Sequence, residues 1–213
     1  MRRTRLGAAA LALLLAATVG AAVTHSTGYA QTVSPGCGSA RWDVKTLGDR
    51  PKLNPEWKAA TVDELGAGMK YGLGPATRGD TLPRQTGFKR VEFTIFRVDA
   101  RLVGWKRSGD GDIHFVIRDI DKQTTLIAEF PKDACVPETT RKGDRTKMAA
   151  ARAAIEEGCG SVTLSSTWRT LSGTIRLVGV GFWDKNHGQK EPAPNRIELH
   201  PVLSATRIHC AKG

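Results

Sequence analysis

The stretch from Val91 to Asp119 constrains the fold of this chain more than any other part of the sequence. Apolar and polar residues alternate along 91–105 and again along 112–119, and a polar link of Ser, Gly and Asp joins the two runs. This pattern is typical of two strands connected by a turn. We therefore expect a mainly β protein whose sheet begins with this hairpin.

Further β segments and one helix are predicted after the hairpin. Turn residues and apolar runs place the strands at 125–130, 171–183 and 196–208. The helix is expected from Arg145 to Glu157, with Asp144 as its N-cap and Gly158 after its last turn.

The predicted order of three strands, one helix and two strands resembles the oligonucleotide/oligosaccharide-binding (OB) fold. The resemblance covers roughly residues 90–210 and includes a long first strand that bends where its alternation breaks, near Phe96 to Val98. We expect a five-stranded, OB-like antiparallel barrel with the helix between its third and fourth strands. Another small antiparallel barrel or sandwich with one inserted helix is the alternative.

Residues 1–30 have the composition of a secretory signal peptide. Three arginines precede an apolar run from Leu6 to Val23, and small residues follow it. A single membrane anchor is the alternative, because the run is nearly long enough to span a bilayer. With removal of the peptide, we expect a secreted or periplasmic protein that is not stably inserted in a membrane.

The chain is strongly basic, and this charge favours anionic partners. Removal of residues 1–30 takes away three arginines and no acidic residue, so the formal charge falls from +11 to +8. Such a balance suits single-stranded nucleic acid or an acidic polysaccharide. Solubility of an exported protein is the other explanation for the excess of lysine and arginine.

Residues 31–88 are rich in Gly and Pro and predict an irregular N-terminal arm that packs on a barrel domain at 89–213. Trp42–Leu47 is expected to be extended. Thr61 and Glu64 form a capping-box pattern for a short helix that reaches about Met69. The expected anchors of the arm are Trp42, Trp57 and Leu65.

The four cysteines all follow the expected cleavage point, and an even number in an exported chain predicts two disulfides. Of the three pairings, we favour Cys135 with Cys159, around the helix, and Cys37 with Cys210, joining the two ends of the mature chain. A structural zinc site is the competing interpretation, but the sequence contains no Cys-x-x-Cys pair.

Several phrases resemble those of a family of exported bacterial proteins whose function has not been assigned. They are 111–119 (GDIHFVIRD), 127–131 (IAEFP) with Cys135, 179–184 (GVGFWD), 187–189 (HGQ) and 193–202 (APNRIELHPV). The resemblance implies export and the barrel, but it carries no catalytic assignment.

A ligand site is expected where OB folds bind, across the second and third strands and between two loops. In this chain the loops are 106–111 and 184–195, which place cations beside large aromatic rings suited to an anionic polymer. The predicted ligand-binding residues are Arg101, Trp105, Lys106, Arg107, Asp112, His114, Trp183, Lys185, His187, Gln189, Lys190, Arg196, Glu198 and His200. The alternative is that the aromatic rings complete the core and the lysines and arginines are merely solvated.

Histidines and carboxylates form a second pattern that overlaps this set. Alternation places Asp112 with His114 on one strand face and Glu198 with His200 on another, while Glu129 ends the third strand. Together with His187, which follows Asp184 in the loop, they suit a divalent metal or a general acid and base. Structural hydrogen bonding is the other interpretation, because no spacing forms an established catalytic motif.

Our first hypothesis is therefore a non-enzymatic, exported OB-like module that binds an anionic or carbohydrate ligand and needs no cofactor. The second is a metal-assisted hydrolase, possibly cleaving phosphodiesters, that uses the histidine and carboxylate cluster. The third is a structural component of the cell envelope.

Overall fold

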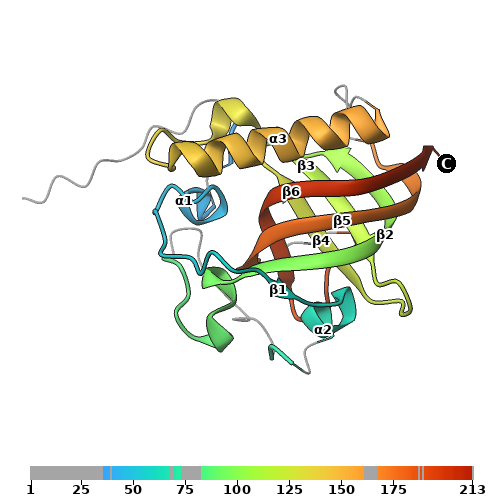
Figure 1. Ribbon diagram of the computed structural model, residues 1–213, viewed down its shortest axis with the longest axis horizontal. Coiled ribbons are helices and arrows are strands. Elements are labelled where there is room, and N and C mark those ends of the chain that lie inside the picture. Colours follow the sequence, from blue (N-terminus) through green and yellow to red (C-terminus); the bar gives the residue numbers. More distant parts are fainter. Residues whose placement is uncertain are drawn as a thin grey trace, which may run out of the picture. The chain divides into compact units, whose positions relative to one another are not determined.

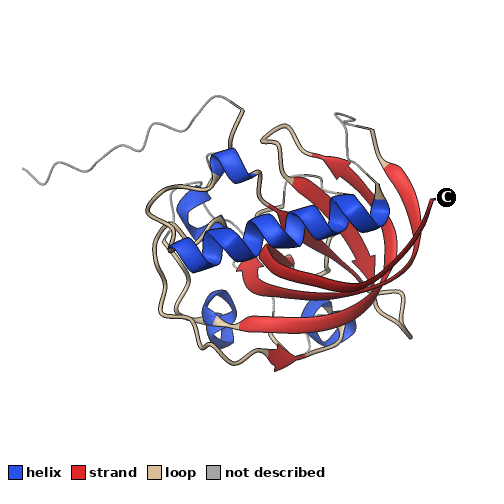
Figure 2. Cartoon of the chain, turned by 45° about the horizontal axis from the view of Figure 1, so that its top comes forward, coloured by secondary structure: helices blue, strands red, loops and turns tan. Residues whose placement is uncertain are grey.

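The structure is a computed structural model that describes residues 36–38, 40–67, 70–72, 83–160, 167–186, 188 and 190–212. It is mainly β, as predicted (Figures 1 and 2). Its helices and strands are α1 Trp42–Lys45, β1 Lys58–Ala59, α2 Val62–Gly66, the 3-10 helix η1 Phe88–Phe93, β2 Ile95–Arg107, β3 Ile113–Arg118, β4 Thr125–Phe130, the 3-10 helix η2 Asp133–Cys135, α3 Lys142–Cys159, β5 Arg169–Trp183 and β6 Ile197–Lys212.

The strands form one six-stranded mixed sheet in the order β1-β2-β3-β4-β6-β5, with an additional pairing between β2 and β5. This pairing closes five of the strands into a ring of hydrogen-bonded neighbours, and the curvature of the sheet is plain in Figure 2. The sequence predicts five antiparallel strands, but β4 pairs with β6 in parallel, and the short β1 pairs with β2 in parallel. A two-residue strand has too few residues to show a period, so β1 could not be found from the sequence.

The first long strand begins later than predicted and bends elsewhere. Val91 belongs to η1, and the pairing of β2 shifts register at Leu102–Gly104 rather than near Phe96–Val98. A Cβ atom on Gly104 would lie 2.8 Å from the carbonyl oxygen of Arg169, so the strands approach too closely there for a side chain. Glycine therefore sets the position of the bulge.

Helix α3 packs on β6 along one side of the sheet (Figure 1). It begins before the predicted N-cap, because the backbone N–H groups of Asp144 and Arg145 already bond to the carbonyl oxygen of Arg141. Asp144 therefore lies in the first turn, where its charge favours the positive end of the helix. Met148, Ala151 and Ile155 are buried, as the helical period requires. No helix among the described residues is long and apolar enough to cross a bilayer.

The N-terminal segment packs on the sheet through α1, which the sequence analysis wrongly predicted to be extended. Trp42 and Val44 are buried two positions apart, which is the strand period, so alternation predicted a strand where a single helical turn forms. Arg41, next to this helix, forms a buried ion pair with Glu92 at 2.6 Å. Trp42 is buried as an anchor, whereas Trp57 is 45% exposed and is not one.

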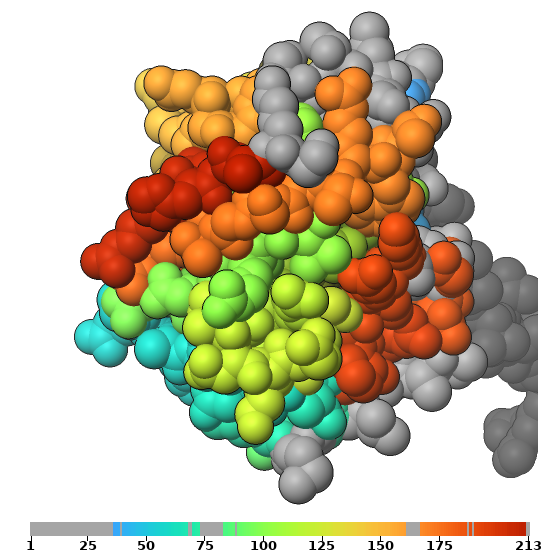
Figure 3. Space-filling view, turned by 90° about the vertical axis from the view of Figure 1, so that its right-hand side faces the viewer, coloured from blue at the N-terminus to red at the C-terminus, as the bar shows by residue number. Residues whose placement is uncertain are grey.

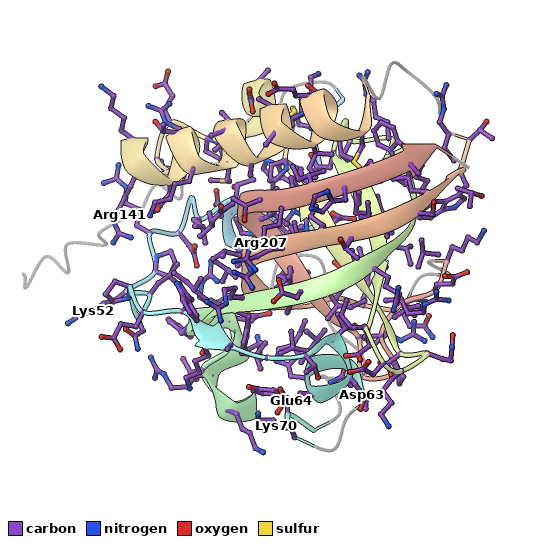
Figure 4. All side chains as sticks on the ribbon, turned by 45° about the vertical axis from the view of Figure 1, so that its right-hand side comes forward. Lys52, Asp63, Glu64, Lys70, Arg141 and Arg207 are labelled. Atoms are coloured by element: carbon purple, nitrogen blue, oxygen red, sulfur yellow. A yellow bond between two sulfur atoms is a disulfide. The ribbon has the colours of Figure 1, made fainter. Side chains whose placement is uncertain are left out.

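The capping box of α2 is confirmed. Thr61 accepts a hydrogen bond from the backbone of Glu64, and the Glu64 side chain accepts one from the backbone of Thr61. Asp63, Glu64 and Lys70 lie close to one another in Figure 4. The Lys70 ammonium forms an ion pair with the Glu64 carboxylate at 2.7 Å. Leu65 is fully buried, as expected for an anchor of the arm. The helix ends at Gly66, before the predicted end near Met69, which itself lies outside the described residues.

Helix α2 also packs beside the turn between β3 and β4, and both reach the surface in Figure 3, where this turn is yellow-green and α2 is teal. Asp119 connects them: its Oδ2 accepts from the backbone N–H of Asp63 at 2.8 Å. Its Oδ1 accepts from the backbone N–H groups of Asp121 and Lys122. One carboxylate therefore fixes the turn and the first turn of the helix.

Two disulfides are present, but the favoured pairing is wrong: Cys37 bonds to Cys135, and Cys159 bonds to Cys210. Cys159 ends the 18-residue helix α3, and such a helix is about 27 Å long. Cys135 precedes this helix and Cys159 is its last residue, and the Cα atoms of the bonded pairs are 5.5 Å (Cys37–Cys135) and 5.1 Å (Cys159–Cys210) apart. Because α3 packs on β6, Cys159 meets Cys210 instead.

Candidate functional site

A cavity of about 700 Å³ opens between the two loops that the sequence analysis singled out. Its walls come from the β2–β3 connection, the β5–β6 connection and α1, and side chains of β3 and β4 reach it from the sheet. Lining residues include Trp42, Lys45, Lys106, Asp110, His114, Glu129, Trp168, Asp184, Lys185 and Lys190. Cys37 and Gly38 also line it, so the first disulfide lies at its edge.

Four of the predicted ligand-binding residues line the cavity: Lys106, His114, Lys185 and Lys190. The ammonium groups of Lys106 and Lys190 lie 5.4 and 5.5 Å from the centre of the Trp168 ring. The His114 ring meets the same indole edge to face, with centroids 5.5 Å apart. Two ammonium groups and one imidazole therefore lie near the Trp168 ring.

The other predicted residues that the structure describes do not line the cavity. The rings of Trp105 and Trp183 are 2% exposed and belong to the core, so the interpretation as a stacking surface is wrong for both. Large aromatic side chains are usually mostly buried, and both rings here fill the interior of the sheet. Further from the cavity or beneath its floor lie Arg101, Arg107, Asp112, Arg196, Glu198 and His200, while His187 and Gln189 fall outside the described residues.

Sequence reasoning missed Trp42, Lys45 and Trp168 as lining residues. Trp42 and Lys45 are three positions apart on α1, and this spacing brings two side chains to one helix face. The sequence predicts a strand here, and on a strand residues three positions apart lie on opposite faces. The common face of Trp42 and Lys45 was therefore not predicted. Trp168 follows residues 161–166, which lie outside the described part of the chain, and no motif marks it.

Below the cavity, two carboxylates and two imidazoles alternate in a chain. Asp112 Oδ2 lies 3.5 Å from His200 Nε2, and His200 Nδ1 lies 3.0 Å from Glu129 Oε2. Glu129 Oε1 in turn accepts a hydrogen bond from His114 Nδ1 at 2.6 Å. Because only His114 and Glu129 of these four line the cavity, the chain leads from the interior to its wall.

Strand pairing sets this order of residues. His114 on β3 lies directly opposite Glu129 on β4. Strand β4 then pairs in parallel with β6, which carries His200. The arrangement β3-β4-β6 thus brings Asp112 and His114 together with Glu129 and His200 from later in the sequence.

Burial and neighbouring charges shift the pKa values of Asp112, His200 and Glu129 in opposite directions. Burial raises the pKa of Asp112 to about 6, although the neighbouring His200 favours its ionised form. Burial alone would lower the pKa of His200, but the charge of Glu129 and the contact with Asp112 raise it instead. Burial would also raise the pKa of Glu129, yet His200, His114 and Lys45 together lower it well below its usual range.

The ionised state of Glu129 fixes the tautomer of His114. A carboxylate only accepts hydrogen bonds, so Nδ1 of His114 must carry the proton in their 2.6 Å contact. The other ring nitrogen, Nε2, is buried and makes no hydrogen bond to the described residues. It is therefore the atom of this ring that can accept a proton.

Lys45 adds a buried positive charge to the same cavity. Burial alone would lower its pKa, but Glu129, Asp184, Glu198 and Asp110 raise it above its ordinary value. Its ammonium lies 3.9 Å from Asp184 and 5.3 Å from the centre of the Phe182 ring. The ammonium therefore stays charged near neutral pH.

Comparisons with protein families, with curated proteins and with solved structures find no match to this chain. The function must therefore be inferred from the site itself.

Proposed function

We propose that this protein is an exported, OB-like module that binds an anionic ring-shaped ligand, specifically an acidic saccharide, in the cavity between the β2–β3 and β5–β6 connections. The observation that carries the proposal is the lining: four lysines and two tryptophans face a space of about 700 Å³. Cavities of roughly 300–1,000 Å³ are the usual size for small ligands.

The mixture of charges favours a saccharide over a nucleic-acid strand. The lysines suit carboxylate or sulfate groups, while Asp110 and Asp184 accept hydrogen bonds from hydroxyl groups. The face of Trp168 suits a sugar ring. A single strand of nucleic acid needs a row of exposed aromatic rings, and Trp105 and Trp183 are buried.

Other features support the OB-like and exported parts of the proposal. The hydrogen-bonded order β2-β3-β4-β6-β5-β2, with α3 between β4 and β5 in the chain, supports the OB-like part of the proposal. Two disulfides are typical of proteins in oxidising compartments. The basic and apolar start of the chain and the resemblance to exported bacterial proteins agree with this location.

Calorimetric titration with an acidic oligosaccharide and with its uncharged counterpart tests the proposal. We expect binding of the acidic form alone, weakening as salt rises because lysine contacts are screened. Trp168→Ala and Lys190→Ala should each weaken binding at least tenfold. Trp57→Ala and Lys122→Ala, which remove exposed side chains away from the cavity, should leave it unchanged. Equal binding of both sugars, or stronger binding of single-stranded nucleic acid, would overturn the proposal.

A hydrolase is the second candidate, and the His114–Glu129 pair is the observation that favours it. In this reaction His114 Nε2 removes a proton from water as the water oxygen bonds to phosphorus. The ester P–O bond breaks, and the leaving oxygen takes a proton from solvent. Cleavage of a nitrophenyl phosphodiester tests this candidate: it requires turnover by the wild type that His114→Gln abolishes and His209→Gln leaves intact.

A further inference from the structure

We propose that Asp112, Glu129 and His200 form a binding site for one divalent transition metal, with Zn²⁺ as the best-matched ion. The site lies beneath the cavity floor, and its existence does not depend on which ligand the cavity takes. The inference rests on the positions of the donor atoms, on how the carboxylates are anchored, and on polar atoms that the described residues leave unsatisfied.

The donor atoms are close enough to share one ion. One ring nitrogen of His200 and one oxygen each of Asp112 and Glu129 all lie within 4.8 Å of one another. Zinc ligands stand about 2.0–2.2 Å from the ion, so neighbouring ligand atoms in a tetrahedral site are roughly 3.4 Å apart. The present separations therefore require only a small closing movement of side chains.

Both carboxylates are anchored in the way that metal ligands are. Asp112 Oδ1 accepts from the backbone N–H of Lys132 at 2.9 Å, which leaves Oδ2 directed to His200. Glu129 Oε1 accepts from His114 at 2.6 Å, which leaves Oε2 directed to His200. Such outer hydrogen bonds hold ligands in position and tune their basicity.

The atoms that point toward one another lack good hydrogen bonds. Asp112 Oδ2 and both ring nitrogens of His200 are buried and make no aligned hydrogen bond to the described residues. Asp112 and His200 are fully buried side chains, and unsatisfied polar groups in such a place are costly. A cation bonded to one oxygen of each carboxylate and to one ring nitrogen of His200 would satisfy one atom of each residue and leave the second ring nitrogen to carry the proton of a neutral imidazole.

Charge and donor type select the class of metal. Two carboxylates supply the two negative charges that a divalent ion neutralises, with the imidazole uncharged. An imidazole nitrogen with carboxylate oxygens suits zinc and its neighbours, whereas Mg²⁺ and Ca²⁺ prefer oxygen ligands alone and usually keep water. We therefore expect Zn²⁺ to bind and Mg²⁺ not to compete.

The test uses untagged protein stripped with a chelator and titrated with Zn²⁺, followed by elemental analysis after desalting. We expect about one zinc per chain, a higher melting temperature with zinc than without it, and visible absorption bands when Co²⁺ replaces zinc. Asp112→Asn keeps the acceptor for the Lys132 N–H and should weaken zinc binding at least tenfold. Glu129→Gln should do the same.

Matched controls separate this site from nonspecific binding. His209→Ala removes an exposed imidazole on the same strand as His200, and Asp121→Asn removes an exposed carboxylate next to β3. Both should retain full zinc binding. The proposal is overturned if folded wild-type protein holds no zinc, or if Asp112→Asn and Glu129→Gln bind it as well as the controls do. Nitrogen NMR that finds protons on both ring nitrogens of His200 in zinc-saturated protein would overturn it too.

Discussion

Glu129 holds His114 and His200 with different oxygen atoms: Oε1 accepts from His114 at 2.6 Å, and Oε2 lies 3.0 Å from His200. One carboxylate on β4 thus joins the wall of the cavity to the interior of the protein. This shared role makes Glu129 the most informative position for testing how the site is held together.

Glu129→Ala should lower the free energy of unfolding by about 3–5 kcal/mol, because it leaves charged or polar partners buried without their carboxylate. Glu138→Ala, an exposed change in the loop before α3, should stay within about 0.5 kcal/mol of the wild type. Urea denaturation followed by circular dichroism measures both. Similar stabilities for the two variants would contradict the buried network.

Asp119 should stabilise the protein near neutral pH, and this contribution should be lost in acid. Burial would raise the pKa of Asp119, but hydrogen bonds from the backbone N–H groups of Asp63, Asp121 and Lys122 outweigh it and lower the pKa. A lowered pKa in the folded state gives stability that is present above the unfolded value of about 3.9. That stability is lost as the pH falls through the folded pKa.

Asp119→Asn removes this contribution, because an amide NH₂ cannot accept the hydrogen bond from Asp63. The variant should therefore be less stable than the wild type at pH 7, and the difference should shrink below about pH 4. Denaturant titrations at a series of pH values measure it. A difference that grows in acid would have the wrong sign for this explanation.

The two disulfides should differ in their effect on the cavity. Each double Cys→Ser variant should lose about 2–4 kcal/mol of stability. Replacement of Cys37 and Cys135 should also weaken ligand binding, because Cys37 and Gly38 line the cavity. Replacement of Cys159 and Cys210 should not, since that bond joins the end of α3 to β6. Thermal melting and the saccharide titration together separate the two effects.

Gly181→Ala should destabilise the protein by about 1–3 kcal/mol, as overpacking of a tight core does. An added Cβ would lie 2.6 Å from Cγ1 of Val91 and 2.8 Å from the Val91 carbonyl oxygen. Gly143→Ala, in the first turn of α3 with open space around it, should instead raise stability by about 0.5–1 kcal/mol. Differential scanning calorimetry should find shifts of opposite sign.

Periodic signals explain which parts of the fold could be predicted. β4 was located residue for residue at 125–130, and the capping box at Thr61 predicted the start of α2. The ends of β2 and α3 and the disulfide pairing depend on tertiary packing, which no local pattern contains. The two-residue β1 and the short α1 are too brief for a period to be read.

The site was predictable in part for the same reason. Alternation predicted that Asp112 and His114 share a strand face, and the structure pairs His114 with Glu129. The two loops that the sequence predicts as the site both line the cavity. It could not distinguish Trp105 and Trp183, which fill the core, from Trp168, which lines the cavity. That difference depends on where the closed sheet leaves space.

The ring-like order of the strands also determines at which stage of folding the site forms. The cavity and the carboxylate and histidine cluster beneath it take side chains from α1, β3, β4, β6 and the β2–β3 and β5–β6 connections, so no short fragment of the chain holds them together. Contacts between such distant segments form late and slowly in folding. Occupancy of the site would therefore report on completion of the entire domain, and whatever binds there would protect all of it against unfolding and proteolysis.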